Sequence, residues 1–196
     1  MKYAIVGLGN PGAEYAHTRH NAGRMIIEQL HKKWECPDWR NDQKANALVS
    51  SHKIRSHSLT LVLPETFMNK SGNAVARFVK GVKAAKYLVV VHDDLDLPLG
   101  ITKISFGRGS GGHKGIESVM RAIKTKDFVR LRIGVSPHTS SGNIKKVEGD
   151  SEVVDFVIGA FKPKEQDELK KVLKKGAAIV EAIIERGYQA AMTEYN

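Results

Sequence analysis

Residues 87–98, YLVVVHDDLDLP, decide the fold because a run of branched apolar residues changes abruptly to acidic ones. An unbroken apolar run is typical of a strand buried on both faces, as in a sheet covered by helices on both sides. The acidic residues Asp93, Asp94 and Asp96, which follow His92, then mark the carboxyl end of a central strand. The stretch predicts an α/β protein with its ligand-binding groups at that end of the sheet.

The segments on either side fit the same plan. Strands are predicted at 2–7, 46–51, 58–63, 101–106 and 128–135, and helices at about 21–34, 70–82, 115–124 and 164–186. Alternating strands and helices predict a three-layer αβα sandwich, a single domain over residues 1–196 with a twisted mixed, mostly parallel sheet. The strands at 46–51 and 58–63 are expected to form a hairpin. Residues 137–160, a polar segment and a short helix, are predicted to form a mobile lid.

Composition narrows the class of partner. The 196-residue chain has 31 Lys and Arg against 21 Asp and Glu, a formal net charge of +10. Such an excess favours a polyanionic partner, nucleic acid first, over a role in solubility alone. Its apolar runs are too short for a membrane span. The lone Cys36 cannot form an intrachain disulfide, which predicts a cytoplasmic location.

Two glycine-rich segments suggest phosphate binding to different degrees. Gly7, Gly9 and Gly12 have the spacing of a dinucleotide fingerprint, but about eight residues separate them from the next helix. No acidic residue follows at the expected distance either, so we interpret this segment as a tight turn that exposes Asn10. The second segment, 107–115, lacks the ending of a P-loop, yet with Arg108 and Lys114 it predicts a phosphate cradle at a helix N-terminus.

His20 lies in the segment TRHN (18–21), directly before the first predicted helix. A helix N-terminus lowers the pKa of a histidine, and a neutral imidazole is what a general base requires. Asp93, at the end of the central strand, can accept the other imidazole N–H and stabilise the imidazolium. Thr18 and Asn21 are expected to hold this junction, with Arg19 pairing locally.

Other interpretations of these segments remain open. His92, Asp93, Asp94 and Asp96 offer a metal site without a recognised ligand spacing, or an acidic turn without chemical role. Consecutive strand residues such as His92 and Asp93 are expected on opposite faces. In the segment 64–72, Asn69 suits either an oxyanion contact or a helix cap.

Five blocks, in this order, resemble the bacterial peptidyl-tRNA hydrolase family. They are IVGLGNPGAEYAHTRHNAG (5–23), LPETFMNKSGNAV (63–75), VVHDDLDLPLG (90–100), GSGGHKGIES (109–118) and RLRIGV (130–135). The resemblance implies a monomeric enzyme that hydrolyses the ester joining a peptide, or an N-blocked aminoacyl group, to the terminal ribose of tRNA. It also implies that the reaction needs no metal, no organic cofactor and no obligate protein partner.

The resemblance assigns roles to individual residues. His20 matches the family's catalytic base, Asp93 its partner, and Asn10 the residue that helps to distinguish blocked from unblocked aminoacyl-tRNA. Asn69 matches an amide that binds substrate and water. The residues that match the lining of the cleft for the peptide and the 3′ end are Tyr15, Phe67 and Met68. Without the resemblance, burial of Phe67 and Met68 under their loop is the favoured interpretation. Arg132 matches a basic residue associated with the tRNA 5′-phosphate.

Two departures from the family pattern concern substrate contacts. Lys114 stands where the family commonly has Asn, and Ser105 stands at the second of two lysine positions. Lys103 remains, and we expect it to form the phosphate clamp with Arg132. The basic residues expected to contact tRNA are Lys103, Arg108, Lys114, Arg132, Lys145 and Lys146.

Three alternatives stay open at this point. The family also has non-catalytic relatives that serve in RNA splicing. Because Lys114 and Ser105 depart from the family pattern, a catalytically weak or inactive RNA-binding protein is one alternative. A metallohydrolase is another. His113 is a second candidate for the base, and it alternatively contacts substrate or supports the glycine-rich loop.

Overall fold

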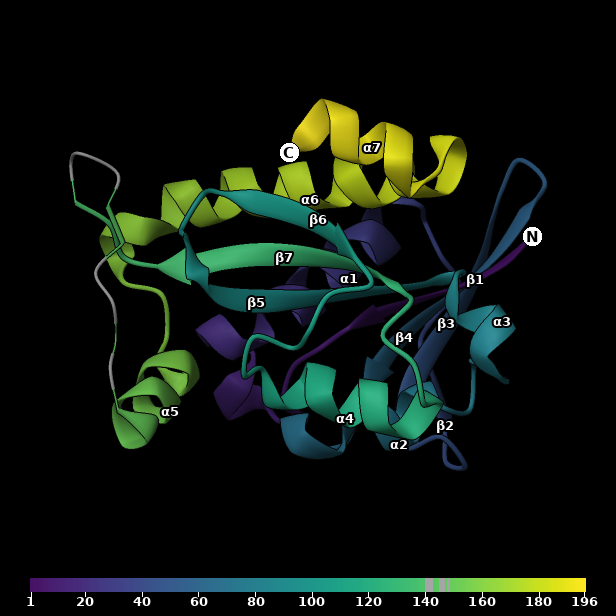
Figure 1. Ribbon diagram of the computed structural model, residues 1–196, viewed down its shortest axis with the longest axis horizontal. Helices are drawn as coiled ribbons and strands as arrows, with labels where there is room; N and C mark the ends of the chain where they lie inside the picture. The colour runs from purple at the N-terminus through teal and green to yellow at the C-terminus, as the bar shows by residue number, and fades with distance from the viewer. Residues whose placement is uncertain (140–142, 145–146, 148) are drawn as a thin grey trace.

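A seven-stranded mixed sheet forms the centre of the computed structural model, which describes residues 1–139, 143–144, 147 and 149–196 (Figure 1). The strands are β1 (Lys2–Gly7), β2 (Arg40–Asp42), β3 (Ala47–Ile54), β4 (His57–Pro64), β5 (Leu88–Pro98), β6 (Thr102–Phe106) and β7 (Val129–Ser136). Their order is β2-β3-β4-β1-β5-β7-β6. Strands β4, β1, β5 and β7 are parallel neighbours, whereas the three outer pairs are antiparallel. The predicted mixed sheet and hairpin are confirmed.

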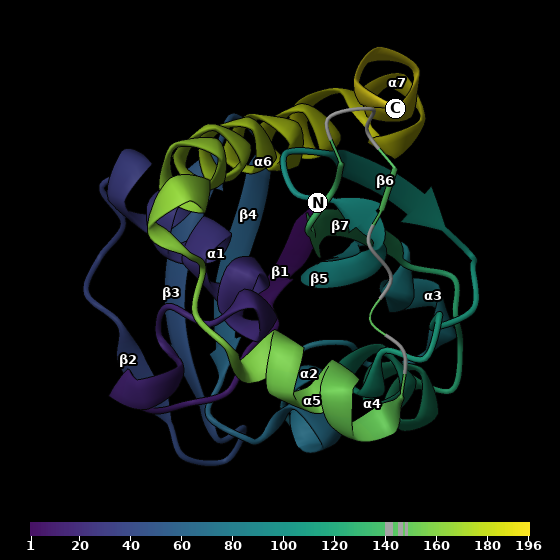
Figure 2. The same ribbon diagram turned by 90° about the vertical axis from the view of Figure 1, so that its left-hand side faces the viewer.

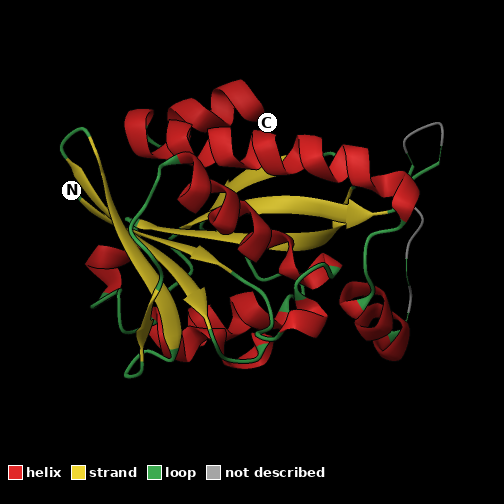
Figure 3. Ribbon diagram, turned by 180° about the vertical axis from the view of Figure 1, so that it is seen from behind, coloured by secondary structure: helices red, strands yellow, loops and turns green. Residues whose placement is uncertain are grey.

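Helices cover both faces of the sheet (Figures 1 and 3). One face packs against α1 (Ala22–Lys33), α6 (Gln166–Arg186) and α7 (Tyr188–Tyr195). The other packs against α2 (Ser71–Val75), α3 (Val82–Ala85) and α4 (Lys114–Ile123). Helix α5 (Asp150–Ile158) lies at the end of the sheet seen in Figure 2. The three predicted layers are confirmed, and among the described residues no helix combines the length and apolar character needed to cross a membrane.

Strand β5 contributes side chains to the hydrophobic cores on both faces of the sheet, because alternate strand residues face opposite ways. Val89 and Val91 are buried against the layer that contains α1 and α6, whereas Leu88 and Val90 are buried against α2 and α4. This explains the unbroken apolar run that predicted a central strand. Beyond Val91 the strand continues to Pro98, so Asp93 lies within β5, opposite Ile133 of β7.

The predicted helix at 70–82 is wrong in part. Helix α2 ends at Val75, and α3 begins only at Val82. Between them the N–H of Phe78 donates to the carbonyl of Val75, three residues back, in a tighter turn. Gly81 then adopts a φ of +86°, which ends the helical path. The apolar residues of this segment nevertheless enter one core, as their spacing predicts.

A glycine lets α1 approach β5 closely. A Cβ on Gly23 would lie 2.2 Å from the carbonyl oxygen of Val91, so no other residue fits there without a shift of the backbone. The preceding 3₁₀ turn, η2 (Arg19–Asn21), is thereby held beside the middle of β5. This approach places His20 near Asp93.

Arg19 links this turn to the other end of the chain, contrary to the predicted local pairing. Its Nη2 lies 2.6 Å from Oε2 of Glu165, 146 residues away, and its Nη1 donates to the carbonyl of Ala160. The guanidinium also lies over the rings of Phe156 and Phe161, 4.6 and 5.0 Å from their centroids. Because Arg19 is only 3% exposed, this buried pair connects the junction of α5 and α6 to the turn that carries His20.

Glu165→Gln should destabilise the protein by about 3 kcal/mol, because it leaves the buried Arg19 without a neutralising carboxylate. Urea unfolding measures the change. Glu185→Gln is the matched control, since Glu185 pairs with Arg55 at 3.5 Å near the surface and should contribute less than about 1 kcal/mol. Equal effects of the two substitutions would contradict the structural role of the Arg19–Glu165 pair.

Candidate active site

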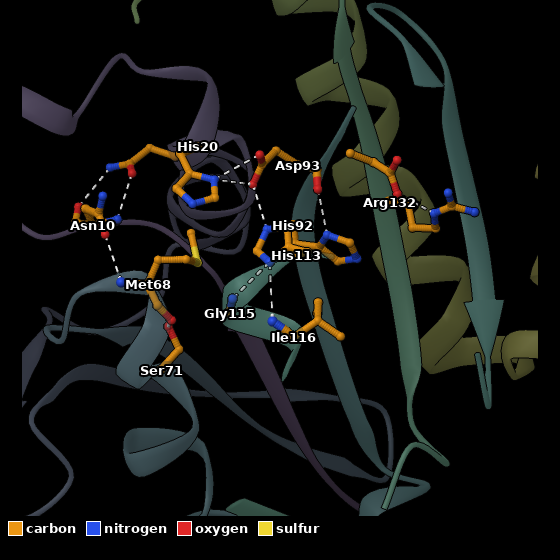
Figure 4. A network of polar contacts seen from close by, with 12 residues as sticks. Asn10, His20, Met68, Ser71, His92, Asp93, His113, Gly115, Ile116 and Arg132 are labelled. Carbon is orange, nitrogen blue, oxygen red and sulfur yellow. Dashed lines mark hydrogen bonds and ion pairs between the residues drawn. The ribbon is translucent and has the colours of Figure 1, made fainter. Parts of the chain in front are cut away.

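A buried carboxylate, that of Asp93, lies between two histidines (Figure 4). Nδ1 of His20 lies 2.9 Å from both carboxylate oxygens. Nε2 of His113, which directly precedes α4, lies 2.9 Å from Oδ1. Asp93 is only 2% exposed. Turn η2, strand β5 and the start of α4 therefore meet at one negative charge.

His113 is a helix cap. Its Nδ1 accepts hydrogen bonds from the backbone N–H groups of Gly115 and Ile116, at 3.1 and 3.3 Å. A ring nitrogen that accepts carries no proton in the neutral imidazole, so the proton is on Nε2 and is donated to Asp93. Both ring nitrogens are thus engaged, which argues against His113 as the base. The two N–H groups are also withdrawn from the predicted phosphate cradle.

His20 keeps one ring nitrogen available. With Nδ1–H donating to Asp93, Nε2 retains its lone pair, and it has no hydrogen-bond partner in the described part of the chain. Burial acts to lower the pKa of His20, but the charge of Asp93 and its hydrogen bond together outweigh burial and raise the pKa above the ordinary 6.5. The lowered pKa expected from the helix N-terminus is therefore wrong, because the adjacent carboxylate dominates.

Asp93 stays ionised at neutral pH. Burial alone would raise its pKa, whereas His20 and His113 lower it through their charges and hydrogen bonds and hold the pKa well below its usual range. A carboxylate in this state orients the His20 ring and stabilises the imidazolium that forms when Nε2 takes up a proton.

The predicted metal set of His92, Asp93, Asp94 and Asp96 does not converge. His92 Nδ1 donates to the backbone carbonyl of Asp93 at 2.6 Å, and burial, reinforced by His113, lowers the pKa of His92 well below 6.5. Its ring packs edge-on against that of His113, with centroids 4.7 Å apart. Asp94 instead binds Nε of Arg132 at 2.5 Å, and Asp96 is exposed. His92 is therefore a neutral packing group beside the site.

A different trio has ligand atoms within reach of one ion. These atoms, from His20, Asp93 and His113, lie within 4.8 Å of one another. A metal bound at Nε2 of a neutral His113 requires the ring proton on Nδ1. That nitrogen already accepts from two backbone N–H groups. The hydrogen bonds of the trio fit proton transfer better than metal binding.

Asn10 joins the loops that follow β1 and β4 (Figure 4). Its Oδ1 accepts from the N–H of Met68 at 2.9 Å, and its backbone exchanges two hydrogen bonds with the side chain of Asn21, at 2.8 and 3.0 Å. Asn21 thus holds the junction as predicted, together with the bond from Thr18 Oγ1 to the carbonyl of Tyr15. The Nδ2 of Asn10 makes no hydrogen bond to any residue described, so this donor remains available.

The predicted site residues in the loop after β4 differ in their exposure. Phe67 is 57% exposed, whereas Met68 is 5% exposed and packs beneath the loop against Gly115. Asn69 is exposed, and the N-cap of α2 is Lys70, so the cap interpretation of Asn69 is wrong. Tyr15, in the 3₁₀ turn η1 (Ala13–Tyr15), is half-buried.

The described basic residues among those predicted to contact tRNA lie on β6, on β7, in the loop after β6 and at the start of α4. Lys103 and Arg132 are direct partners in the β6–β7 ladder, so they share a face, which is compatible with the predicted phosphate clamp. Ser105 lies opposite Arg130 in the same ladder. Arg108 and Lys114 are exposed. Lys145 and Lys146 lie outside the described residues, as do parts of the predicted lid at 137–160.

Comparisons with known proteins match nearly the whole chain. The family profile described as peptidyl-tRNA hydrolase matches residues 4–196. A peptidyl-tRNA hydrolase of Aquifex aeolicus is 38% identical over 193 residues, which cover 98% of this chain and 95% of that protein. A peptidyl-tRNA hydrolase from Syntrophomonas wolfei is 35% identical over 193 residues, which cover 98% of this chain and 98% of that protein. The crystal structure of peptidyl-tRNA hydrolase from Acinetobacter baumannii has a TM-score of 0.86 at 34% identity, with 99% of this chain and 94% of that chain covered. The chain therefore belongs to the peptidyl-tRNA hydrolase family.

Proposed function

We propose that this peptidyl-tRNA hydrolase uses Nε2 of His20 as a general base, with Asp93 as the partner of the imidazole. The substrate is the ester that joins a peptide or an N-blocked aminoacyl group to the terminal ribose of tRNA. One observation carries the proposal: Asp93 accepts the Nδ1–H of His20 at 2.9 Å, which leaves the lone pair of Nε2 unbonded among the described residues.

The reaction proceeds by addition and elimination. Nε2 of His20 takes a proton from a water molecule, whose oxygen bonds to the carbonyl carbon of the ester. Asp93 stabilises the resulting imidazolium. The tetrahedral intermediate then collapses by breaking the bond to the ribose oxygen, which receives the proton from His20. The products are the free peptide acid and tRNA with its terminal hydroxyl restored.

We assign two side-chain amides, those of Asn10 and Asn69, to substrate binding. The N–H of Met68 holds Oδ1 of Asn10, so Nδ2 is oriented as a donor toward a carbonyl oxygen of the substrate. Asn69, exposed on the adjacent turn, supplies a second amide for the substrate and the attacking water. One such donor to a developing oxyanion contributes about 10²–10³-fold in rate. His113 acts as a positioning residue for Asp93 and not as a second base.

The remaining predicted residues complete the substrate contacts. Tyr15 and Phe67 contact the peptide and the 3′ end, while Lys103 and Arg132 bind a phosphate near the 5′ end. The described part of the predicted lid at 137–160, which includes α5, closes over the bound substrate. We also propose that the protein acts as a monomer in the cytoplasm without a metal or organic cofactor. Among the residues that the structure describes, Lys114, 73% exposed, forms only a long ion pair with Glu117 at 3.8 Å, which leaves it available to RNA phosphate.

His20→Ala should lower the single-turnover rate on N-acetylated aminoacyl-tRNA by about 10²–10⁴-fold, with tRNA affinity unchanged within about twofold. Rapid-quench cleavage and filter binding measure the two quantities. His17→Ala, an exposed histidine three positions away, is the matched control and should keep full activity. Binding without turnover in the unmodified protein would instead establish the RNA-binding alternative.

The pH dependence of kcat/KM should show an acidic limb above pH 6.5, since the base must lose its proton and Asp93 raises its pKa. Asp93→Asn removes both effects that raise the pKa of His20 and leaves burial, which lowers it. In that variant the limb should therefore move below 6.5 while the plateau rate falls. A pH–rate profile over about pH 5–9 tests this, and a limb that does not move in Asp93→Asn would disprove the coupling.

A further inference from the structure

A cavity of about 540 Å³ opens at the end of the sheet where β1 and β5 begin. Four lysines line it, namely Lys2, Lys80, Lys83 and Lys86, and we call it the lysine pocket. Helix α3, which carries Lys83, lies at the right of Figure 1, whereas α5 lies at the left. Helix α5 contacts η2, the turn that carries His20, so the lysine pocket is at the opposite end of the sheet from His20.

The positive charge of the lysine pocket is not compensated by nearby acids. None of its four ammonium groups is ion-paired with a described carboxylate, and the lysines that are so paired are Lys33, Lys114 and Lys170. The sequence has no Asp or Glu between Glu65 and Asp93, although Lys70, Arg77 and three lysines of the pocket lie in that interval. Unpaired like charges repel one another, and a bound polyanion relieves the repulsion.

The inner wall of the lysine pocket is apolar. Phe78, Val79, Ala84 and Tyr87 line it, and the ammonium group of Lys86 lies 4.9 Å from the centroid of the Tyr87 ring. Lysine stems commonly pack on such a surface while their charged ends stay in water. Several ammonium groups around one depression suit the phosphates of a nucleic-acid backbone, which lysine binds without sequence preference.

The distance to the catalytic centre decides which part of a substrate can reach the lysine pocket. Tyr87 and Asp93 are six residues apart along β5, or about 20 Å at strand spacing. The scissile ester cannot occupy both places, but the body of a tRNA extends far beyond this distance. Helix α4 connects the two regions on the same side of the sheet: it begins beside His113 and ends before the exposed Lys124 and Lys126.

We propose that the lysine pocket binds backbone phosphates in the helical body of the tRNA substrate, as a contact separate from the 3′-end site. This inference rests on the proposed function. The contact adds affinity for full-length tRNA and leaves the chemistry of ester cleavage unchanged, because no residue of the pocket reaches the scissile bond.

The test compares two triple variants with equal changes of charge. One carries Lys80→Glu, Lys83→Glu and Lys86→Glu. The control carries Lys171→Glu, Lys174→Glu and Lys175→Glu, which are exposed on α6 across the sheet. Affinity for deacylated tRNA is measured at several salt concentrations. Cleavage is measured on N-acetylated aminoacyl-tRNA and on the same ester carried by a short 3′-terminal oligonucleotide.

The pocket variant should lose at least tenfold in tRNA affinity at low salt, and its slope of log K against log salt should fall by about two to three. Its cleavage of the short substrate should stay within twofold of the unmodified protein. The α6 variant should lose less than threefold in tRNA affinity. A third variant with Gln at the three pocket positions should show an intermediate loss, and unfolding midpoints should agree among all four proteins.

Equal losses of affinity in the pocket and α6 variants would overturn the proposal, because overall charge would then explain both. A loss on the short substrate as large as that on tRNA would also overturn it. Failure of the unmodified protein to cleave either ester would refute the proposed function instead, and the comparison of tRNA affinities would still decide whether the lysine pocket is a contact.

Discussion

The carboxylate of Asp93 is the group on which the rest of the site depends. A charged carboxylate that is only 2% exposed costs several kcal/mol in lost hydration unless donors replace the water. Two imidazole N–H groups, from His20 and His113, replace it. The fold must therefore bring η2 and the start of α4 to the middle of β5, where Asp93 lies. Gly23 makes the first approach possible, because its missing side chain leaves room for the Val91 carbonyl.

The two histidines differ in what their second nitrogen does. His113 uses Nδ1 to cap α4, so the helix itself sets the tautomer that donates to Asp93. His20 has no such partner among the described residues, and its side chain is 15% exposed against 9% for His113. One shared carboxylate thus produces a structural imidazole and a reactive one. Substitution of His113 would disturb a helix cap and the orientation of Asp93 together.

Much of the fold follows from local patterns. The apolar run before Asp93 predicts the buried strand β5, and the short loop between two β-rich segments predicts the β3–β4 hairpin. The helical spacing of the apolar residues also predicts which residues of 70–82 enter the core. It does not predict the break before Gly81, which depends on a positive φ and not on hydrophobicity. Helix α7 and the short strand β2 were not predicted, since neither has a clear periodic pattern. Helix α7 forms by packing on the core, and β2 forms by pairing with β3.

Local sequence patterns predict the candidate active site only in part as well. General acid–base chemistry predicts that His20 needs a carboxylate, and the acidic segment after the apolar run of β5 offers Asp93. The predicted lowering of the pKa of His20 is wrong, because the effect of a carboxylate at 2.9 Å outweighs that of a helix N-terminus. The pairing of Arg19 with Glu165 has no local signal, since the partners are 146 residues apart and meet only in the folded chain. The capping role of His113 was accessible from its place directly before a predicted helix.

The central claim is that His20 and His113 carry their protons on different ring nitrogens and share one carboxylate. Nitrogen-15 NMR of the imidazole rings, recorded from acidic to alkaline pH, reports the protonated nitrogen of each histidine directly. Above its pKa, His20 should be protonated at Nδ1 alone, with a midpoint above 6.5, while His113 should be protonated at Nε2. A proton on Nε2 of His20 or on Nδ1 of neutral His113 would contradict the account.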